Sequence, residues 1–364
     1  MSPHSRSGRR ARLAAVIVVA VALAPAMTAC SALTGSSSST TAPATAPAGA
    51  SGAATTPAAS ATPGTSSTEP TIVVATTSGA IERLNPATGA VGQTLVPAGT
   101  GVLGDELSVS DSGTVYYAVG SGACDSTIYS IPDGGGGGTP TPIASGTLPT
   151  ISPDGTKLAY AVEPRAAQDC SGWDTSTPGT AFKVDIRTIS SGTTVSIPEL
   201  PATQQGLPAP ITHLSWASDN DHLAVSIEPV QDNEGWALNT LDTSNAQTYL
   251  GANVTTVPVT GASPHGQSFL SEGVYLPDGN LFVVHSCCAG IEGKTDAPLL
   301  WEVLPDGALL RQVAIGFANT VHDSLDVSAD GNWLLYLGGG DLYVSQGGAR
   351  PSQITTGLAA AAWA

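Results

Sequence analysis

The stretch Ile151-Ser152-Pro153-Asp154-Gly155-Thr156-Lys157-Leu158-Ala159-Tyr160 decides the fold, because degraded copies of it recur along the chain. Each copy contains a short apolar strand, a turn of the Asp-Gly type and a second apolar strand. The turns of the other four copies contain Gly113, Asn220, Gly279 and Gly331. Asp-Gly supplies the positive φ angles that tight hairpins require. A hairpin repeated every ~40–65 residues is typical of the blades of a β-propeller.

Two more strands are expected in each repeat, so that every unit becomes a four-stranded antiparallel blade. The third strands are predicted at residues 127–131, 182–189, 237–241, 299–304 and 342–345. The fourth strands are predicted at residues 141–144, 193–197, 246–250, 309–315 and 352–355.

The two ends of the repeat region predict the number of blades. Residues 360–364 form one more first strand with nothing after it. The three missing strands are predicted at 72–75, 80–84 and 92–96, at the start of the region. The C-terminal strand should therefore complete the N-terminal blade and cover two exposed sheet edges. We predict an all-β, six-bladed β-propeller with a composite closing blade.

The repeat resembles the TolB-type propeller repeat, in which a first strand ends in Ser-Pro-Asp-Gly and an aliphatic or aromatic strand follows. Ser152-Pro153-Asp154-Gly155 matches fully, and the turns at Gly279 and Gly331 match in most positions. The resemblance covers nearly the whole predicted propeller. It implies a fold but no single activity, because such propellers serve as binding platforms, sensor domains and appendages of hydrolases. The chain also resembles exported lipoproteins of actinobacterial cell envelopes.

Residues 1–30 have the pattern of a lipoprotein-type signal peptide. Four arginines precede an apolar run over residues 13–23, and Met27-Thr28-Ala29-Cys30 resembles a lipobox. Cys30 is the predicted site of lipidation, for example with palmitate. The alternatives are ordinary secretory cleavage near this point or a retained N-terminal anchor.

Residues 31–70 are predicted to be a disordered linker, because they consist almost entirely of Ala, Ser, Thr, Pro and Gly. The propeller should then occupy residues 71–364. This order predicts a protein held on the outer side of the cytoplasmic membrane by its lipid, with secretion as the alternative. No contact with the membrane is expected other than through the lipid anchor.

The charge of the chain limits its partners. The formal net charge is −17, and four of the 12 basic residues lie in the predicted signal peptide. Such acidity argues against nucleic acid as a partner. An envelope protein or a glycan fits better, and the oligomeric state is left open.

Long connections are expected on one face of the ring only. The links between second and third strands (163–180, 228–235 and 285–298) and between blades (96–105, 198–212 and 251–267) should emerge together. The opposite face should consist of short turns. Elaborated loops on a rigid scaffold commonly carry binding sites, so we place the binding face on the long-loop side.

The predicted long-loop face contains the candidate site residues. Cysteines in an exported chain favour disulfides, with three possible pairings among Cys124, Cys170, Cys287 and Cys288. A copper or redox site involving His285 is the alternative. The binding-face candidates are Trp173, Trp236, His213, His265, His285, His322 and Asp323. Four other tryptophans, Trp216, Trp301, Trp333 and Trp363, are expected to pack within the fold.

These features favour a non-enzymatic binding or sensory module for an envelope protein or glycan. No nucleophile elbow, His-Glu-x-x-His motif or phosphate-binding loop occurs in the sequence, and we assign no catalytic residue and no cofactor. The alternative is an extracellular propeller enzyme with a metal held by loop residues such as His285, His322 and Asp323. Whether any metal is bound is left open.

Overall fold

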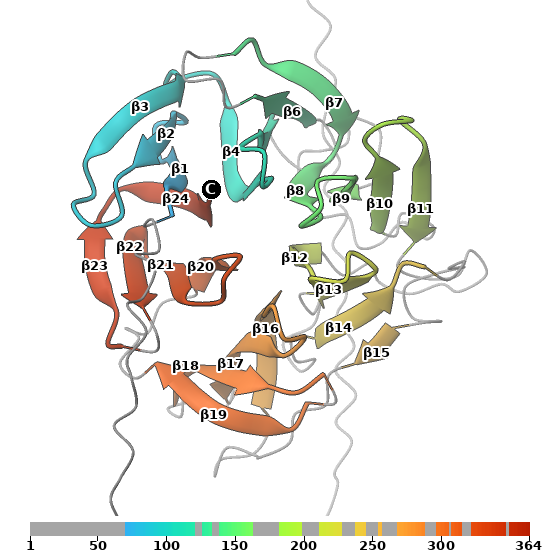
Figure 1. Ribbon diagram of the computed structural model, residues 1–364, viewed down its shortest axis with the longest axis vertical. Helices are drawn as coiled ribbons and strands as arrows, with labels where there is room; N and C mark the ends of the chain where they lie inside the picture. Colours follow the sequence, from blue (N-terminus) through green and yellow to red (C-terminus); the bar gives the residue numbers. More distant parts are fainter. Residues whose placement is uncertain are drawn as a thin grey trace, which may run out of the picture. The chain divides into compact units, whose positions relative to one another are not determined.

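The computed structural model describes residues 70–120, 126–132, 138–162, 182–198, 211–227, 237–244, 254–256, 268–287, 296–305, 307–314, 322–346 and 349–364. These residues form six four-stranded antiparallel sheets around a common centre (Figure 1). The predicted six-bladed β-propeller is therefore confirmed. In this part of the chain, no helix has the length and apolar character needed to cross a bilayer.

We number the sheets as blades 1 to 6 in chain order. Their strands, from the centre outward, are β24 (Leu358–Trp363), β1 (Ile72–Thr76), β2 (Ile81–Leu84) and β3 (Val91–Val96) in blade 1; β4 (Val102–Val109), β5 (Val115–Val119), β6 (Thr127–Ile131) and β7 (Thr141–Ser145) in blade 2; β8 (Thr147–Ile151), β9 (Lys157–Val162), β10 (Lys183–Thr188) and β11 (Thr194–Pro198) in blade 3; β12 (Ile211–Trp216), β13 (His222–Ile227), β14 (Ala237–Asp242) and β15 (Val254–Thr256) in blade 4; β16 (Ser268–Tyr275), β17 (Leu281–Cys287), β18 (Asp296–Val303) and β19 (Leu309–Ala314) in blade 5; and β20 (His322–Val327), β21 (Trp333–Gly338), β22 (Asp341–Gln346) and β23 (Ser352–Thr355) in blade 6.

Blade 1 is composite, as predicted. In Figure 1 the red strand β24 lies beside the blue strand β1, and the two pair in antiparallel register from Ile72–Trp363 to Ala75–Ala360. The backbone N–H of Ala364 also donates to the carbonyl of Thr71 at 2.8 Å. Each inner strand contacts the next one around the ring, and β20 contacts β24, so the ring is closed.

The core consists of six apolar layers, one at each junction between neighbouring blades. Strand β1 shows how one strand serves two layers. Ile72 and Val74 pack against blade 6, whereas Val73 and Ala75 pack against blade 2. Successive side chains of a strand point to opposite faces, so a strand between two layers must be apolar on both.

The repeated Asp-Gly turns have a structural role. In blade 6 the Asp330 carboxylate accepts the Ser328 hydroxyl at 2.6 Å and the backbone N–H of Asn332 at 3.0 Å. These hydrogen bonds hold the pKa of Asp330 below its ordinary value. Gly155 and Asn220 occupy the same turn position with φ angles of 70° and 62°. Asparagine is among the few residues that tolerate this conformation, which explains how it replaces glycine there.

Every inner strand also contains an irregularity in its pairing with its neighbour, near the end at which the strand begins. In blades 3 and 6 the irregular segment contains a non-glycine residue in the left-handed region, Leu148 at φ 53° and Ser324 at φ 59°. Both residues lie seven positions before the turn glycine of their repeat. The two blades therefore share one backbone geometry at this level.

Several predicted positions need correction. The fourth strand of blade 4 is Val254–Thr256, not residues 246–250, which lie outside the described residues. Val254-Thr255-Thr256 is a β-branched run, which favours extended structure. His285 lies in strand β17 opposite Leu270 and Leu299, not in a loop. Cys287 also lies in β17. His213, His322 and Asp323 lie within inner strands, because β12 begins at Ile211 and β20 begins at His322.

Candidate functional site

A cavity of about 640 Å³ lies at the centre of the ring. The six inner strands β24, β4, β8, β12, β16 and β20 all contribute to its wall. The lining continues to the turns between first and second strands, where Asp111, Pro153, Ser218, Pro277 and Ala329 belong to it. The cavity therefore occupies the part of the channel next to the short-turn face.

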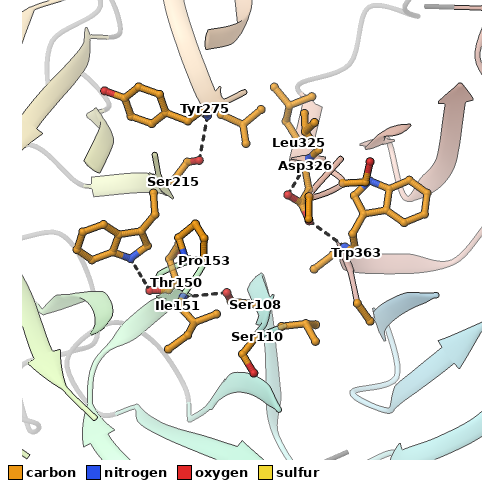
Figure 2. Close-up of a pocket in the computed structure, with 18 of the residues that line it drawn as sticks. Ser108, Ser110, Thr150, Ile151, Pro153, Ser215, Tyr275, Leu325, Asp326 and Trp363 are labelled. Atoms are coloured by element: carbon orange, nitrogen blue, oxygen red, sulfur yellow. Dashed lines mark hydrogen bonds between the residues drawn. The ribbon is translucent and has the colours of Figure 1, made fainter. Parts of the chain in front are cut away.

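The lining is rich in hydroxyl groups and acidic in character. Serines and threonines contribute to it from blades 2, 3, 4 and 6, and Asp111, Asp326 and Asp330 add carboxyl groups. The described lining includes no Lys or Arg. The ring of Tyr275 points away from the centre of the cavity (Figure 2), and the other lining residues of blade 5, Val274, Leu276 and Pro277, are apolar.

One lining position connects neighbouring blades by the same hydrogen bond. It lies five residues before the turn glycine or asparagine, and it is Ser108 in blade 2, Ser215 in blade 4 and Asp326 in blade 6. The Ser108 Oγ accepts the N–H of Ile151 at 2.9 Å, and the Ser215 Oγ accepts the N–H of Tyr275 at 3.1 Å. Figure 2 shows these bonds around the cavity wall.

Asp326 makes the corresponding bond at the closing junction. Its Oδ2 accepts the N–H of Trp363 at 2.8 Å, and its Oδ1 accepts the N–H of Val327 at 2.8 Å (Figure 2). The inner edge of an innermost strand has no neighbouring strand, so its N–H groups need other acceptors. The polar residue at this position supplies one.

Blade 3 uses the equivalent residue, Thr150, differently. The Thr150 hydroxyl donates to the carbonyl of Leu214 at 3.3 Å, and the Thr150 carbonyl accepts the indole N–H of Trp216 at 2.9 Å. In blade 5 the equivalent residue is Val274, which has no polar group in its side chain. The inter-blade hydrogen bond is therefore a repeated feature with local variation.

Two ionisable groups of the lining have shifted pKa values. Burial raises the pKa of Asp326 to about 6, although its two backbone N–H donors oppose the shift. Burial lowers the pKa of His213 to about 4. His213 is therefore neutral at pH 7 and does not offset the negative charge of the cavity.

The structure describes only some of the predicted binding-face residues. His213 is buried in β12 and lines the cavity. His285, Cys287, His322 and Asp323 lie in described strands, but their side chains are not described. Outside the described residues lie Cys30, Cys124, Cys170, Cys288, Trp173, Trp236 and His265. The disulfide, lipidation and long-loop assignments thus stay predictions.

The packing role predicted for four tryptophans is confirmed. Trp216 and Trp363 are buried, and Trp301 and Trp333 pack against buried apolar clusters. Among the described residues, no group of three or more His, Cys, Asp or Glu side chains is arranged to hold a metal ion.

Sequence reasoning missed the position that lines the cavity. Ser108, Thr150, Ser215 and Asp326 are polar residues at one register position, in first strands that contain other polar residues as well. The usable signal was therefore the recurrence of a polar residue at the same distance from the turn, not its polarity alone.

Comparison with solved structures agrees with this fold. The putative TolB from Agrobacterium tumefaciens is similar over 80% of this chain and 92% of its own, with a TM-score of 0.51 and 13% identity. The β-propeller domain of the trilobed protease from Pyrococcus furiosus covers 68% of this chain and 70% of its own, with a TM-score of 0.41 and 15% identity. A prolyl endopeptidase covers 77% of this chain, with a TM-score of 0.44 and 12% identity, but the match spans only 38% of the endopeptidase.

The chain is thus a six-bladed β-propeller whose fold is similar to that of the putative TolB. The similarity at these identities concerns the fold alone. No protein-family model and no curated protein matches the sequence.

Proposed function

We propose that this protein is a non-enzymatic binding or sensory module of the cell envelope. Lipidated Cys30 and the linker over residues 31–70 would hold it outside the cytoplasmic membrane. Its proposed macromolecular partner is an envelope protein or a glycan, as the acidity of the chain and the TolB-like fold suggest.

The central cavity is the observation that carries this proposal. It is a concave site whose wall combines apolar side chains with hydroxyl and carboxyl groups, and its volume of about 640 Å³ lies in the range of ligand pockets. Hydrogen bonds between blades hold its wall residues in place. A wall held in this way loses little conformational freedom when a ligand binds, which favours affinity.

Both faces of the ring are candidates for the partner. The long-loop face is the prediction from loop lengths, and most of its residues lie outside the described ones. The short-turn face is the one that the cavity reaches. A test must therefore separate the two faces.

Crosslinking and affinity capture from native envelope would make this separation. One variant lacks residues 163–180 and 288–295, and a second carries Ala329→Trp, which adds bulk at an exposed position of the cavity lining. Ala349→Trp is the matched control, because Ala349 is also exposed but does not line the cavity. Circular dichroism melting should confirm that each variant is folded.

We expect wild type and Ala349→Trp to capture the same partner. Loss in the loop variant assigns the partner to the long-loop face, and loss in Ala329→Trp assigns it to the short-turn face. Capture of the same set by all four proteins, or of nothing by wild type, would contradict the proposed binding role.

The proposed location has its own test. We expect wild type to partition into the detergent phase of a Triton X-114 extract and to incorporate a labelled fatty acid. Cys30→Ala should do neither. Fatty-acid labelling of Cys30→Ala equal to that of wild type would contradict lipidation at Cys30.

A further inference from the structure

Strand β24 differs from the other inner strands in how it is attached to its blade. In blades 2 to 6 the inner strand continues into the second strand through a short turn, whereas no such turn joins β24 to β1. Four of the six residues of β24 are alanines, so its burial removes less apolar area from water than burial of larger side chains would. Segments with few apolar contacts are the ones that open locally while the rest of a domain stays folded.

Release of β24 would open the wall of the central cavity. Ala361, Ala362 and Trp363 all line the cavity. In the closed ring the carboxyl group of Asp326 holds this strand, because its Oδ2 accepts the N–H of Trp363 at 2.8 Å (Figure 2). This hydrogen bond connects the state of one side chain to the closure of the cavity.

Asp326 supplies the hydrogen-bond acceptors on both sides of its strand. Its Oδ1 accepts the N–H of Val327 at 2.8 Å. Val327 lies four residues before its turn glycine, as Ile151 and Tyr275 do, and a serine of the preceding blade accepts the N–H of each of those two residues. The preceding blade offers Val327 only Val274, which has no polar atom in its side chain. One carboxyl group therefore takes both N–H groups.

Asp326 is also the one titratable residue at the inter-blade position of blades 2 to 6. The equivalent residues of blades 2 to 5 are Ser108, Thr150, Ser215 and Val274. None of these four side chains changes its charge between pH 4 and 8. A change of pH in this range therefore acts on the closing junction and not on the equivalent bonds elsewhere in the ring.

The surroundings of Asp326 offer no positive charge to balance its ionised form. The strands that contact β20 are β4, β16, β21 and β24, and the sequences of these five strands contain no Lys or Arg. Negative neighbours and a position away from water both disfavour a carboxylate. The titratable groups on these strands and around the cavity are Asp105, Glu106, His322 and Asp323, whose side chains are not described, and Glu272, Tyr275, Tyr336, His213, Asp111, Asp330 and the carboxylate of the last residue, Ala364.

Burial accordingly raises the pKa of Asp326 to about 6, against the effect of its two N–H donors. Burial lowers the pKa of His213 to about 4, and it raises the pKa of Tyr275 and of Tyr336 above the ordinary value. Between pH 5 and 7 the charge of Asp326 therefore changes, while His213 and the two tyrosines stay largely neutral.

We infer that Asp326 is a proton-controlled latch on the central cavity, in which protonation of its carboxyl group favours the closed ring and ionisation favours release of β24. When β24 opens, the carboxyl group gains water and its pKa returns toward the ordinary value of about 3.9. The closed ring then binds the proton more tightly than the open ring, so opening becomes more frequent as the pH rises from about 4 to 6, and levels off above. As a control of access to the cavity, the latch rests on the proposed use of the cavity as a binding site.

Hydrogen exchange of the full chain, followed by mass spectrometry between pH 4 and 8, tests the latch. Division of each exchange rate by the intrinsic rate of the unstructured peptide at the same pH leaves the opening constant. For peptides that cover residues 358–364, we expect this constant to rise by as much as about 100-fold between pH 4 and 7, as a pKa difference of about two units implies. Peptides that cover β8, which Ser108 holds, should show a much smaller change.

Two variants identify the group responsible. Asp326→Asn keeps the size of the side chain and one carbonyl acceptor but cannot ionise, so the opening constant of its β24 should not depend on pH. Asp111→Asn is the matched control, because Asp111 is an exposed carboxylic acid of the same cavity lining. It should keep the pH dependence of wild type.

An opening constant of β24 that does not change with pH in wild type would overturn the inference. The wild-type pH dependence in Asp326→Asn, or its loss in Asp111→Asn, would do the same. An equal rise for β8 would show that the whole ring responds and not the latch. Because this experiment uses no ligand, each of these results leaves the proposed binding role to its own test.

Discussion

The junction between blades 2 and 3 and the junction between blades 6 and 1 solve one problem with different chemistry. In both, a side chain on an inner strand accepts an N–H from the next inner strand: Ser108 accepts from Ile151, and Asp326 accepts from Trp363. The carboxylate also accepts the N–H of Val327. Blades 2 and 3 are joined by Gly146 alone between β7 and β8, whereas blade 1 is completed by a strand from the far end of the propeller.

The stronger hydrogen-bond acceptor, a carboxylate instead of a hydroxyl, occurs at the junction between blades 6 and 1. A hydrogen bond to an ionised group is stronger than one between neutral groups, and Asp326 makes two. The carboxylate occurs at the junction that depends on strand pairing for its closure. The cost is a buried ionisable group, whose pKa rises for that reason.

The largest effect should come from the residue on the closing strand. Trp363 is buried between blades 1 and 6, and Trp363→Ala should destabilise the protein by about 3–5 kcal/mol. Ile151→Ala removes the equivalent side chain of blade 3 and should cost less, about 2–3 kcal/mol. Urea unfolding followed by tryptophan-independent circular dichroism measures both. A larger loss in Ile151→Ala would contradict the special role of the closing strand.

The second-largest effect should be the difference in stability between replacing the acceptor Asp326 and replacing the acceptor Ser108. Asp326→Ala leaves two N–H groups without acceptors and should cost about 2–4 kcal/mol, whereas Ser108→Ala leaves one and should cost about 1–2 kcal/mol. Asp111→Ala is the control, because Asp111 is exposed at the rim and should change stability by less than about 0.5 kcal/mol. Equal losses at 108 and 326, measured by urea unfolding, would show that the second bond contributes nothing.

The pH dependence of stability separates the carboxyl from the hydroxyl. The pKa of Asp326 is about 6 in the folded protein and about 3.9 when unfolded, so the folded state binds more protons and stability falls as the pH rises from 4 to 6. The pKa of His213 is about 4 when folded and about 6.5 when unfolded, so stability rises from pH 4 to 6.5. Each trend amounts to as much as roughly 3 kcal/mol, and the two oppose each other.

Replacing either Asp326 or His213 should therefore leave only the pH dependence of stability that the other residue causes. Asp326→Ser gives the closing junction the residue of blade 2, and its stability should rise more steeply with pH than that of wild type. His213→Gln should show the opposite slope. Unfolding free energies between pH 4 and 7 provide the measurement, and curves parallel to wild type would refute both assignments.

The smallest effect concerns the turns of blades 3 and 4, which also touch each other. Gly155→Ala should cost about 1 kcal/mol, because an L-residue is strained at its φ of 70°. Asn220→Gly relieves that strain but removes the acceptor of the Asp154 N–H, 3.0 Å away. We expect a change below about 1 kcal/mol there by thermal melting, and a loss larger than in Gly155→Ala would contradict this balance.

The sequence was informative wherever a local pattern repeats. The Asp-Gly turns, together with the three strands left over at the start of the region and the single strand at its end, predicted six blades and the pairing of β24 with β1. The outer strand of blade 4 was misplaced, because Val254-Thr255-Thr256 carries no repeat signal of its own. Strand limits around His213 and His285 were missed for a related reason, since histidine suits a strand as well as a loop.

The cavity was harder to predict, because it arises from six segments far apart in the chain. Asp326 is one of 29 acidic residues in the sequence, and only the closed ring places it beside Trp363. Loop length directed attention to the opposite face. A polar residue in a buried inner strand was the better indicator, because such a residue must bond either to the neighbouring blade or to a ligand.

The composite blade also sets an order for folding. Blades 2 to 6 each pair strands that follow one another in the chain, so their contacts are local and form early. Closure instead joins residues such as Thr77 and Gly357, which are 280 positions apart. Strand β1 is the first strand of the propeller in the sequence, and β24 is the last. One edge of β1 therefore has no partner strand until β24 pairs with it. We therefore expect the pairing of β24 with β1 to be the last step of folding, and the wall of the central cavity to be complete only after it.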